Sequence, residues 1–488
     1  LFRSEGDSLL DGDRTKNGIL VLRGGVVHAV LTGNSPAHLV VEPGAVVKLN
    51  SDLSVNGGEL GRLEVGGAVV TCLSDDSAGG DTDGYVADEY NRPNLLDRCS
   101  SYTIRGFGAE GSYIRGSTLN HLWSIQGLGA MRIERNTFAG YDALTLSTNF
   151  TFSSASTAAA LAGLQPVISG NHFTCPDGDL DVIISLVGTA AVVEGNTLVT
   201  PPPGMDRTDC GAKIIVGYAR QRETDVILPA EGTTLITGNT FVDDGIGSSI
   251  EYDVDTGARS LLAGRPDHFV QEPLRVEIRA NRFAGRGRTA MAVWGFSETV
   301  IEDNVVEDYE TSVEVAVNAP LDGEAGEALL LPADGFRVSR NYFLPDLAAT
   351  TPRRGVVLTR GVPRETIEDM VAQDALVDAE NNYWGHETGP DDRQDWDGLV
   401  NVLGEGASAG QGVDYDPWIG TIDEPVADLR PDGPLEVTLT ETATLTAHVT
   451  NLAGAPLVSM PVTFTSSDPS VARLLYAVGT SDADGNAV

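Results

Sequence analysis

The sequence is poor in lysine and in basic residues generally. Of 488 residues, 32 are Lys or Arg and 70 are Asp or Glu, a formal net charge of -38 with an isoelectric point near 4.3. The lysines are Lys16, Lys48 and Lys213. This acidic field repels nucleic-acid phosphates and anionic lipid headgroups, whereas it favours solubility, high salt or divalent cations. We therefore expect no nucleic-acid partner.

Long apolar runs are also missing. The best stretch, VIISLVGTAAVV from Val182, lies between Asp181 and Glu194 and is shorter than the roughly 18 residues that a membrane-spanning helix needs. We expect no membrane insertion of this segment. The chain starts at Leu1 without a basic and then apolar signal segment, so we expect it to be a portion of a longer protein.

Support for nucleophilic catalysis is scarce as well. The seven histidines are scattered along the chain. We predict no catalytic residues and no organic cofactor.

Cysteine is scarce and falls into two local pairs. Cys72 and Cys99 are 27 residues apart, Cys175 and Cys210 are 35 apart, and each pair brackets a segment rich in Asp, Gly and Pro. A disulfide closing such a segment reduces its loop entropy. We predict two disulfides and an extracellular or cell-surface location; four unpaired buried thiols are the alternative. Metal ligation is not expected, because no CxxC or paired His accompanies them.

What the sequence does contain is a recurring hexad, in which an aliphatic residue is followed three positions later by Asn and then by an apolar residue. The copies read IERNTF, ISGNHF, VEGNTL, ITGNTF, IRANRF, IEDNVV, VSRNYF and AENNYW. Their asparagines are Asn136, Asn171, Asn196, Asn239, Asn281, Asn304, Asn341 and Asn382, spaced by 23 to 43 residues. Repeats of this length are typical of solenoids.

The segments around each hexad are short, rich in Val, Ile, Thr and Phe, and separated by Gly and Asp, which predicts a β solenoid. Asn tolerates left-handed backbone angles, so we expect it at a tight corner between two strands. Stacked asparagines would form a structural amide ladder, with the aliphatic and aromatic hexad residues pointing inward.

These hexads, with LVVEPGAVVKL upstream, resemble the right-handed parallel β-helix proteins of the pectate-lyase-like superfamily. The stretches DDSAGGDTDG, NNYWGHETGP and GVDYDPWIG are similar to β-helix domains of large secreted or surface proteins that are often fused to immunoglobulin-like modules. The resemblance implies an all-β fold, with a β-helix over residues 18–420 after an N-terminal extension, 1–17. Activities in that superfamily vary widely, so the fold alone implies none.

A second domain is predicted after a Pro/Asp-rich linker, residues 421–434. Alternating strands LEVTLT, ATLTAHVTN and MPVTFTSSD follow, and residues 435–488 resemble an invasin-type bacterial immunoglobulin-like domain. Such a β-sandwich needs more residues than are present, so we expect it to be incomplete. Either the chain continues, or a strand of another molecule, for which NGILVLR (17–23) is the candidate, completes it.

Acidic loops are the candidate metal sites. In DDSAGGDTDG, glycines between the aspartates would let the chain wrap around Ca²⁺. In DGDLDV, alternate aspartates of one strand would share a face. The candidate ligands are Asp75, Asp76, Asp81, Asp83, Asp177, Asp179 and Asp181, and solvated turns are the alternative. A third acidic loop contains Asp391, Asp392, Asp395 and Asp397.

The loop NNYWGHETGP contains His386 and Glu387, which could form an acid and base pair. However, Asn382 is the last hexad Asn, Trp384 takes the place of the inward Phe, and Gly385, Gly389 and Pro390 then interrupt the strand. We predict that this loop ends the β-helix and that Trp384 and Trp418 form a structural C-terminal cap.

Two functions are compatible with these patterns. The first is a non-enzymatic extracellular rod, an adhesin or filament subunit whose partners are copies of itself or a surface polysaccharide. The second is a secreted Ca²⁺-dependent lyase or epimerase acting on a uronate polymer, for which clustered Asp and Arg should line a groove. No basic cluster is evident in the sequence, which favours the rod.

Overall fold

The protein is described by a computed structural model. The described residues are 2–5, 8–11, 19–23, 25–30, 38–49, 53–55, 62–72, 102–106, 111–120, 122–126, 130–139, 145–147, 165–174, 184–187, 190–199, 214–217, 219–221, 226–228, 232–243, 248–252, 275–285, 289–294, 298–320, 327–329, 335–345, 353–358, 362–420, 425–431, 445–451, 456, 461–463, 478–482, 484, 486 and 487. Within this part of the chain, no helix has the length and hydropathy needed to cross a membrane.

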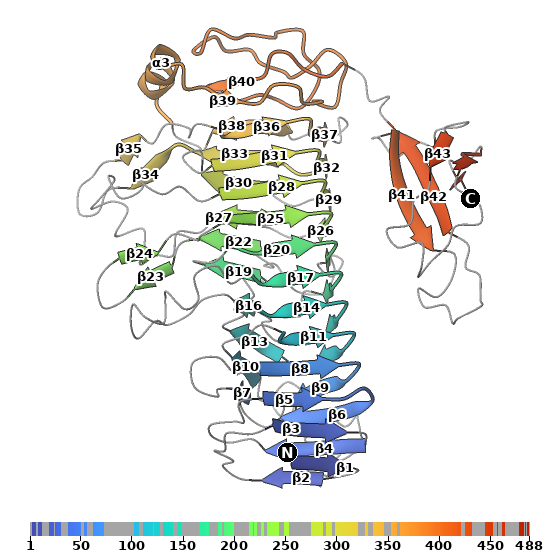
Figure 1. Ribbon diagram of the computed structural model, residues 1–488. Coiled ribbons are helices and arrows are strands. Elements are labelled where there is room, and N and C mark those ends of the chain that lie inside the picture. Colours follow the sequence, from blue (N-terminus) through green and yellow to red (C-terminus); the bar gives the residue numbers. More distant parts are fainter. Residues whose placement is uncertain are drawn as a thin grey trace, which may run out of the picture.

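The chain forms a parallel β-helix, as predicted, in which three sheets run along the solenoid (Figure 1). Sheet A has 14 strands, sheet B has 12 and sheet C has 10, and the strands within each sheet pair in parallel. Neighbouring parallel strands must be joined by a crossover connection, and here the chain passes through the other two sheets before it returns to the first.

The strands of each sheet follow one another in chain order. Sheet A consists of β1 (Phe2–Glu5), β3 (Ile19–Arg23), β5 (His38–Val41), β8 (Arg62–Gly66), β11 (Tyr113–Arg115), β14 (Arg132–Glu134), β17 (Val167–Ser169), β20 (Val192–Glu194), β25 (Thr233–Thr237), β28 (Arg275–Arg279), β31 (Glu298–Glu302), β36 (Arg337–Ser339), β39 (Val377–Asp378) and β40 (Val413–Asp414). Sheet B consists of β2 (Ser8–Asp11), β4 (Gly25–Val30), β6 (Ala45–Leu49), β9 (Val69–Cys72), β12 (Thr118–Asn120), β15 (Thr137–Ala139), β18 (His172–Thr174), β21 (Thr197–Val199), β26 (Thr240–Asp243), β29 (Arg282–Gly285), β32 (Val305–Glu307) and β37 (Tyr342–Leu344). Sheet C consists of β7 (Leu53–Val55), β10 (Tyr102–Gly106), β13 (Leu122–Gln126), β16 (Thr145–Ser147), β19 (Ile184–Val187), β22 (Ile214–Gly217), β27 (Ser248–Tyr252), β30 (Thr289–Trp294), β33 (Thr311–Ala316) and β38 (Arg354–Leu358).

The hexads form the corner between sheets A and B. From β8 to β37, every connection between these two sheets is two residues long, and from β14 onward the second of the two is the ladder Asn. The first residue, not the Asn, has the left-handed backbone, with φ between +52° and +63°. These residues are Gly67, Gly116, Arg135, Gly170, Gly195, Gly238, Ala280, Asp303, Arg340 and Asn381. The expected left-handed Asn was therefore misplaced by one position.

The ladder Asn connects one turn of the solenoid to the next. In a typical step, Asn239 Oδ1 accepts hydrogen bonds from both the backbone N and the side-chain Nδ2 of Asn196, each 2.9 Å long. Asn239 Nδ2 then donates to Asn281 Oδ1 and to the Val193 carbonyl. The same pattern runs without a break from Asn136 to Asn382, and the Ser117 backbone N joins it at Asn136 Oδ1. All eight asparagines are at most 2% exposed, so the ladder is buried.

The first and last hexad positions build the core. The first residues, from Ile133 to Val338, are fully buried in sheet A, and the last ones, from Phe138 to Phe343, are buried in sheet B, whereas Ala379 and Trp384 of the final hexad are buried in the segment that follows. Aromatic rings of successive turns stack there: Phe138 lies on Phe173 at 4.7 Å and Phe241 on Phe283 at 4.6 Å between ring centroids. Such contacts add to the area burial that stabilises the solenoid.

Residues 362–420 close the solenoid and are called the cap below. Helix α3 (Arg364–Ala372) buries Ile367 and Met370 against the core. Tyr383 pairs with Tyr342 at the edge of sheet B, Ser408 pairs with Arg354 at the edge of sheet C, and β39 and β40 extend sheet A. The cap therefore covers the last strand of all three sheets, which removes edges that would otherwise pair with other chains.

The two predicted cap tryptophans lie in this region. Trp384 is fully buried and packs edge-on against Phe343, with ring centroids 5.4 Å apart. A Cβ on Gly355 would lie 2.3 Å from the Trp384 ring, so that neighbour has to be glycine. Trp418 is partly buried and packs on Tyr415.

Among the described strands, long connections occur along the two borders of sheet C. They leave sheet B for sheet C at 73–101 and 200–213, and leave sheet C for sheet A at 148–166, 218–232, 253–274, 317–336 and 359–376. The hairpins β23–β24 (Ala219–Gln221, Val226–Leu228) and β34–β35 (Asn318–Pro320, Glu327–Leu329) belong to these connections and lie on the same side as α3 in Figure 1. From β8 to β37 the corner between sheets A and B is uniform, so the turns differ in length at the borders of sheet C.

Both ends of the chain differ from the predicted domain boundaries. In the predicted extension 1–17, β1 and β2 already belong to sheets A and B. Strand β3, within the predicted donor segment 17–23, pairs with β1 on one side and β5 on the other, so it is not free to complete another molecule's sheet.

The predicted linker also contains a strand, β41 (Pro425–Pro431), paired antiparallel with β42 (Leu445–Asn451). Proline is tolerated there because β41 lies at the edge of the sheet β41-β42-β45. Strand β45 is Asn486–Ala487, and β43 (Pro461–Thr463) pairs with β44 (Val478–Thr480). The immunoglobulin-like assignment of residues 435–488 stays a prediction.

Candidate functional site

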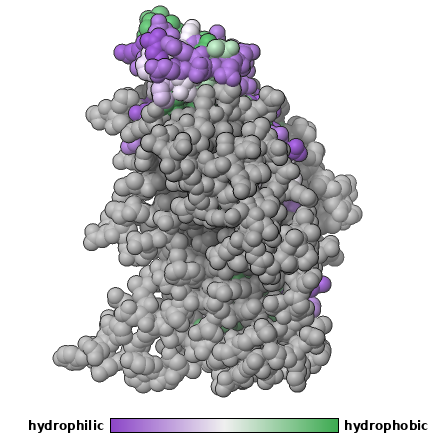
Figure 2. Space-filling model, turned by 90° about the vertical axis from the view of Figure 1, so that its left-hand side faces the viewer, coloured by the Kyte–Doolittle hydropathy of each residue, from purple (hydrophilic) through white to green (hydrophobic). Residues whose placement is uncertain are grey.

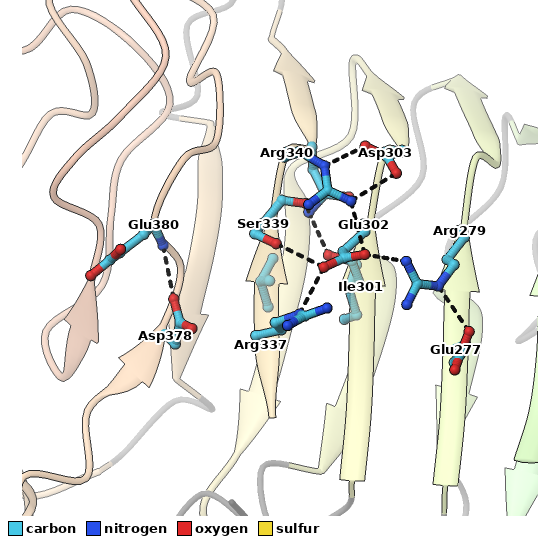
Figure 3. Close-up of polar contacts among 12 residues, drawn as sticks. Glu277, Arg279, Ile301, Glu302, Asp303, Arg337, Ser339, Arg340, Asp378 and Glu380 are labelled. Atoms are coloured by element: carbon cyan, nitrogen blue, oxygen red, sulfur yellow. Dashed lines mark hydrogen bonds and ion pairs between the residues drawn. The ribbon is translucent and has the colours of Figure 1, made fainter. Parts of the chain in front are cut away.

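The outer face of sheet A carries a cluster of charged residues from three successive turns. Its centre is Glu302, at the end of β31, whose side chain is 1% exposed. Arg337 Nε lies 2.7 Å from Glu302 Oε1, Arg340 donates to Oε2 at 2.9 Å, and Arg279 bonds the same oxygen (Figure 3). The Ser339 hydroxyl donates to Oε1 at 3.2 Å. One carboxylate thus joins β28, β31 and β36.

Outer carboxylates of the cluster balance the arginines. Asp303 accepts a forked pair of hydrogen bonds from Arg340, 2.9 and 3.1 Å long, and Glu277 accepts one from Arg279 at 2.9 Å. Burial raises the pKa of Glu302, but Arg279, Arg337 and Arg340 lower it more, so the pKa lies below its ordinary value. Hydrogen bonding to Asp303 raises the pKa of Arg340. Both groups stay charged at neutral pH.

A smaller cluster repeats this design nearer the N-terminus. Glu134 occupies the same hexad position as Glu302 and is bonded by Arg115 and Arg132. Burial raises the pKa of Glu134, but the two arginines together lower it by more, so the pKa lies below its ordinary value. Arg115 also lies over the Tyr113 ring, 5.2 Å from its centroid. These ion pairs connect neighbouring turns.

The cap contains a second kind of site, a buried carboxylate pair. Asp392 and Asp397 are 3% and 6% exposed. Asp392 Oδ1 accepts hydrogen bonds from Gln411 Nε2 and the Gln394 backbone N, and its Oδ2 accepts from the Tyr415 hydroxyl at 3.2 Å. Asp397 accepts from the backbone N of Leu399 and Gly412. The two side chains fix irregular loops whose backbone lacks regular partners.

Burial raises the pKa of Asp392 to about 6, and the nearby charges of Asp397 and Asp391 add to the shift. The hydrogen bonds from Gln394 and Tyr415 oppose it only in part. Burial also raises the pKa of Tyr415. Asp392 therefore takes up a proton near pH 6 in the folded protein.

The third acidic loop does not form the predicted metal site. Asp391 pairs with Arg393 at 2.8 Å, and the carboxylates of Asp392 and Asp397 turn inward to protein donors. Among the described residues, no group of three His, Cys, Asp or Glu side chains is arranged to hold a metal ion.

Most other predicted site residues lie outside the described residues. These are Asp75, Asp76, Asp81, Asp83, Asp177, Asp179, Asp181, Cys99, Cys175 and Cys210. Cys72 is the last residue of β9. The calcium and disulfide assignments thus stay predictions.

His386 and Glu387 are not arranged as an acid and base pair. His386 Nδ1 lies 2.9 Å from the Thr388 hydroxyl, and its Nε2 lies 3.5 Å from Glu405. The Glu387 carbonyl accepts from the Trp418 indole at 3.4 Å. These contacts join the loop to other residues of the cap.

The clusters on sheet A were missed in the sequence because partners from different turns meet only through strand register: Glu302 lies 23 to 38 residues from its arginines, and Glu134 lies 19 from Arg115. A signal exists: Glu occupies the second hexad position in IERNTF and IEDNVV, and in both cases the hexad of a neighbouring turn contains an arginine. Aligning the hexads would have placed Arg279 beside Glu302, since the two are direct partners in the sheet.

Comparison with known proteins found one distant structural likeness to report. No protein-family model matches the chain, and no curated protein matches it significantly. Among solved structures, it is similar to the catalytic unit of the thermostable GH87 α-1,3-glucanase from Streptomyces thermodiastaticus strain HF3-3, at 14% sequence identity and a TM-score of 0.32. The similarity covers 85% of this chain and 62% of that one, less than two thirds of its length. A likeness this distant carries no statement about activity.

Replacing Glu302 with Gln should lower the free energy of unfolding by about 2 kcal/mol, because it leaves three arginines around a neutral buried group. The partial exposure of the arginines keeps the effect below that of a fully buried pair. The matched control is Glu298→Gln, whose ion pair with Arg275 is more exposed and should contribute about 0.5 kcal/mol at most. Urea denaturation measures the free energy of unfolding of both variants. Equal losses would show that Glu302 does not hold the neighbouring turns together.

Asp392 makes the stability of the cap pH-dependent. Its pKa rises from 3.8 to about 6 on folding, so the folded protein binds this proton more tightly than the unfolded chain. The contribution of this proton to the free energy of unfolding is fully present below about pH 4. It is lost as the pH rises through 6, which lowers the free energy of unfolding by about 2 to 3 kcal/mol.

Asp392→Asn keeps the side-chain shape and should remove most of this fall. Trp384, Trp396 and Trp418 lie in the cap, so unfolding followed by tryptophan fluorescence at pH 4 and pH 7.5 reports on it. An Asn variant with the same pH dependence as the original protein would show that another group is responsible.

Proposed function

We propose that this chain is a rigid, non-catalytic scaffold of a secreted or cell-surface protein, whose binding residues lie in the long connections between its strands. The observation that carries this proposal is the contrast between the two kinds of corner. From β8 to β37 the corner between sheets A and B is two residues long, and from Asn136 onward it is joined by buried amides, whereas both borders of sheet C have long connections. A surface that varies on a fixed support is typical of binding proteins.

The charged groups of the described residues support a structural role. A lyase of the kind considered above needs a basic group that can accept a proton, and general bases work best when their pKa lies near the working pH. Arg340 instead has a raised pKa and is committed to Asp303 and Glu302. The arginine cluster is therefore a clamp between turns. Adhesion to a surface polysaccharide is the binding activity that we favour.

Binding and catalysis can be separated in one experiment. The full chain is applied to an array of immobilised neutral and acidic polysaccharides, and the same polysaccharides are incubated with it in solution. We expect retention on at least one glycan without new reducing ends and without unsaturated products that absorb in the ultraviolet.

A variant in which the connection 253–274 is replaced by a short Gly/Ser link is compared with a variant shortened at 200–213. At least one of them should lose retention while its melting temperature stays the same. Product release by the unmodified chain, or unchanged retention by both variants, would contradict the scaffold function.

A further inference from the structure

The large apolar side chains that the described part of the protein exposes all lie in the cap. They are Val371, 42% exposed, on α3, and three residues of one loop, Val400, Val402 and Leu403. In the loop, exposure rises from 53% at Val400 to 63% at Val402 and 79% at Leu403. Figure 2 shows apolar residues at the top of the cap among hydrophilic ones. We call residues 398–404 the apolar loop.

The backbone of the apolar loop is firmly held. Asn401 and Asp392 exchange both backbone hydrogen bonds, 2.8 and 3.2 Å long, and Asn401 Nδ2 donates to the Thr388 carbonyl at 2.8 Å. A Cβ on Gly404 would lie 1.7 Å from the Pro390 carbonyl oxygen, so the base of the loop touches its neighbour closely. Leu399 packs against the core. The loop thus presents Val402 and Leu403 outward in a fixed geometry, which lowers the entropy lost on binding.

The cap that carries the loop is acidic. Residues 362–420 contain 14 Asp and Glu against two Arg, a formal net charge of -12, although Asp392 and Asp397 are buried. Glu405, next to the loop, has a side chain that is 72% exposed. An apolar projection from an acidic cap fits an apolar pocket bordered by cationic groups. A second copy of this chain, with a net charge of -38, and an anionic membrane are both repelled.

We propose that the apolar loop is a docking site for a cationic amphipathic polypeptide, whose apolar face receives Val402 and Leu403 while its Lys or Arg residues face Glu405 and the acidic cap. This surface is separate from the connections around sheet C, so its failure and that of the scaffold function are distinguishable.

The probe is a synthetic amphipathic Leu/Lys helix, titrated against the full chain at physiological ionic strength. The double variant Val402→Ser/Leu403→Ser should weaken its binding by about tenfold or more, because two apolar contacts are lost. Val371→Ser, an exposed position on α3, is the matched control and should change the affinity by about twofold at most. The melting temperature of each variant shows whether it folds. It should be unchanged, because the replaced side chains are exposed.

Three results would overturn the proposal. One is failure of the original chain to bind the Leu/Lys helix, or equal binding by the double variant. Another is equally tight binding of a Leu/Glu helix of the same pattern, which would remove the charge requirement. The third is a dimer of the original chain in sedimentation that the double variant lacks, because the occupant would then be a second copy.

Discussion

The buried amide ladder is the interaction on which the rest of the solenoid depends. Each Asn side chain accepts from the backbone and side chain of the Asn in the turn before and donates to the turn after, as Asn239 does between Asn196 and Asn281. Buried polar groups are tolerated only when their hydrogen bonds are satisfied, and here each turn satisfies its neighbour. The ladder therefore requires every corner that carries a ladder Asn to have the same length and backbone path.

That constraint determines where the chain can vary. A two-residue corner with a left-handed first residue places an aliphatic side chain before it and an apolar one after it in the core of each hexad turn. Ion pairs such as those of Glu302 tie the outer face of sheet A. Insertions are accommodated at the borders of sheet C, and the cap ends the ladder at Asn382 by covering the last strand of each sheet. The connections at the borders of sheet C and the cap are thus the parts of the chain that the ladder leaves free to differ and to bind other molecules.

The local part of this architecture could be predicted from the sequence. The hexads predicted the solenoid, because they combine corner and core residues within six positions, and NNYWGHETGP predicted where it ends. The strand β41 between Pro425 and Pro431 was overlooked because prolines usually interrupt strands, and β1 and β2 because they lack a hexad. The Glu302 and Asp392 networks join residues that are far apart in the chain, so they follow from register and loop packing, which composition does not reveal.

The ladder is tested most directly by Asn239→Ala, which leaves the buried Asn196 backbone N and the Val193 carbonyl without their side-chain partner. The neighbouring Thr240→Ala, partly exposed on sheet B, serves as the reference. If the amides hold the turns together, urea denaturation should show a loss of about 3 kcal/mol or more for Asn239→Ala and less than about 1 kcal/mol for Thr240→Ala. Equal, small losses in the two variants would contradict the central role of the ladder.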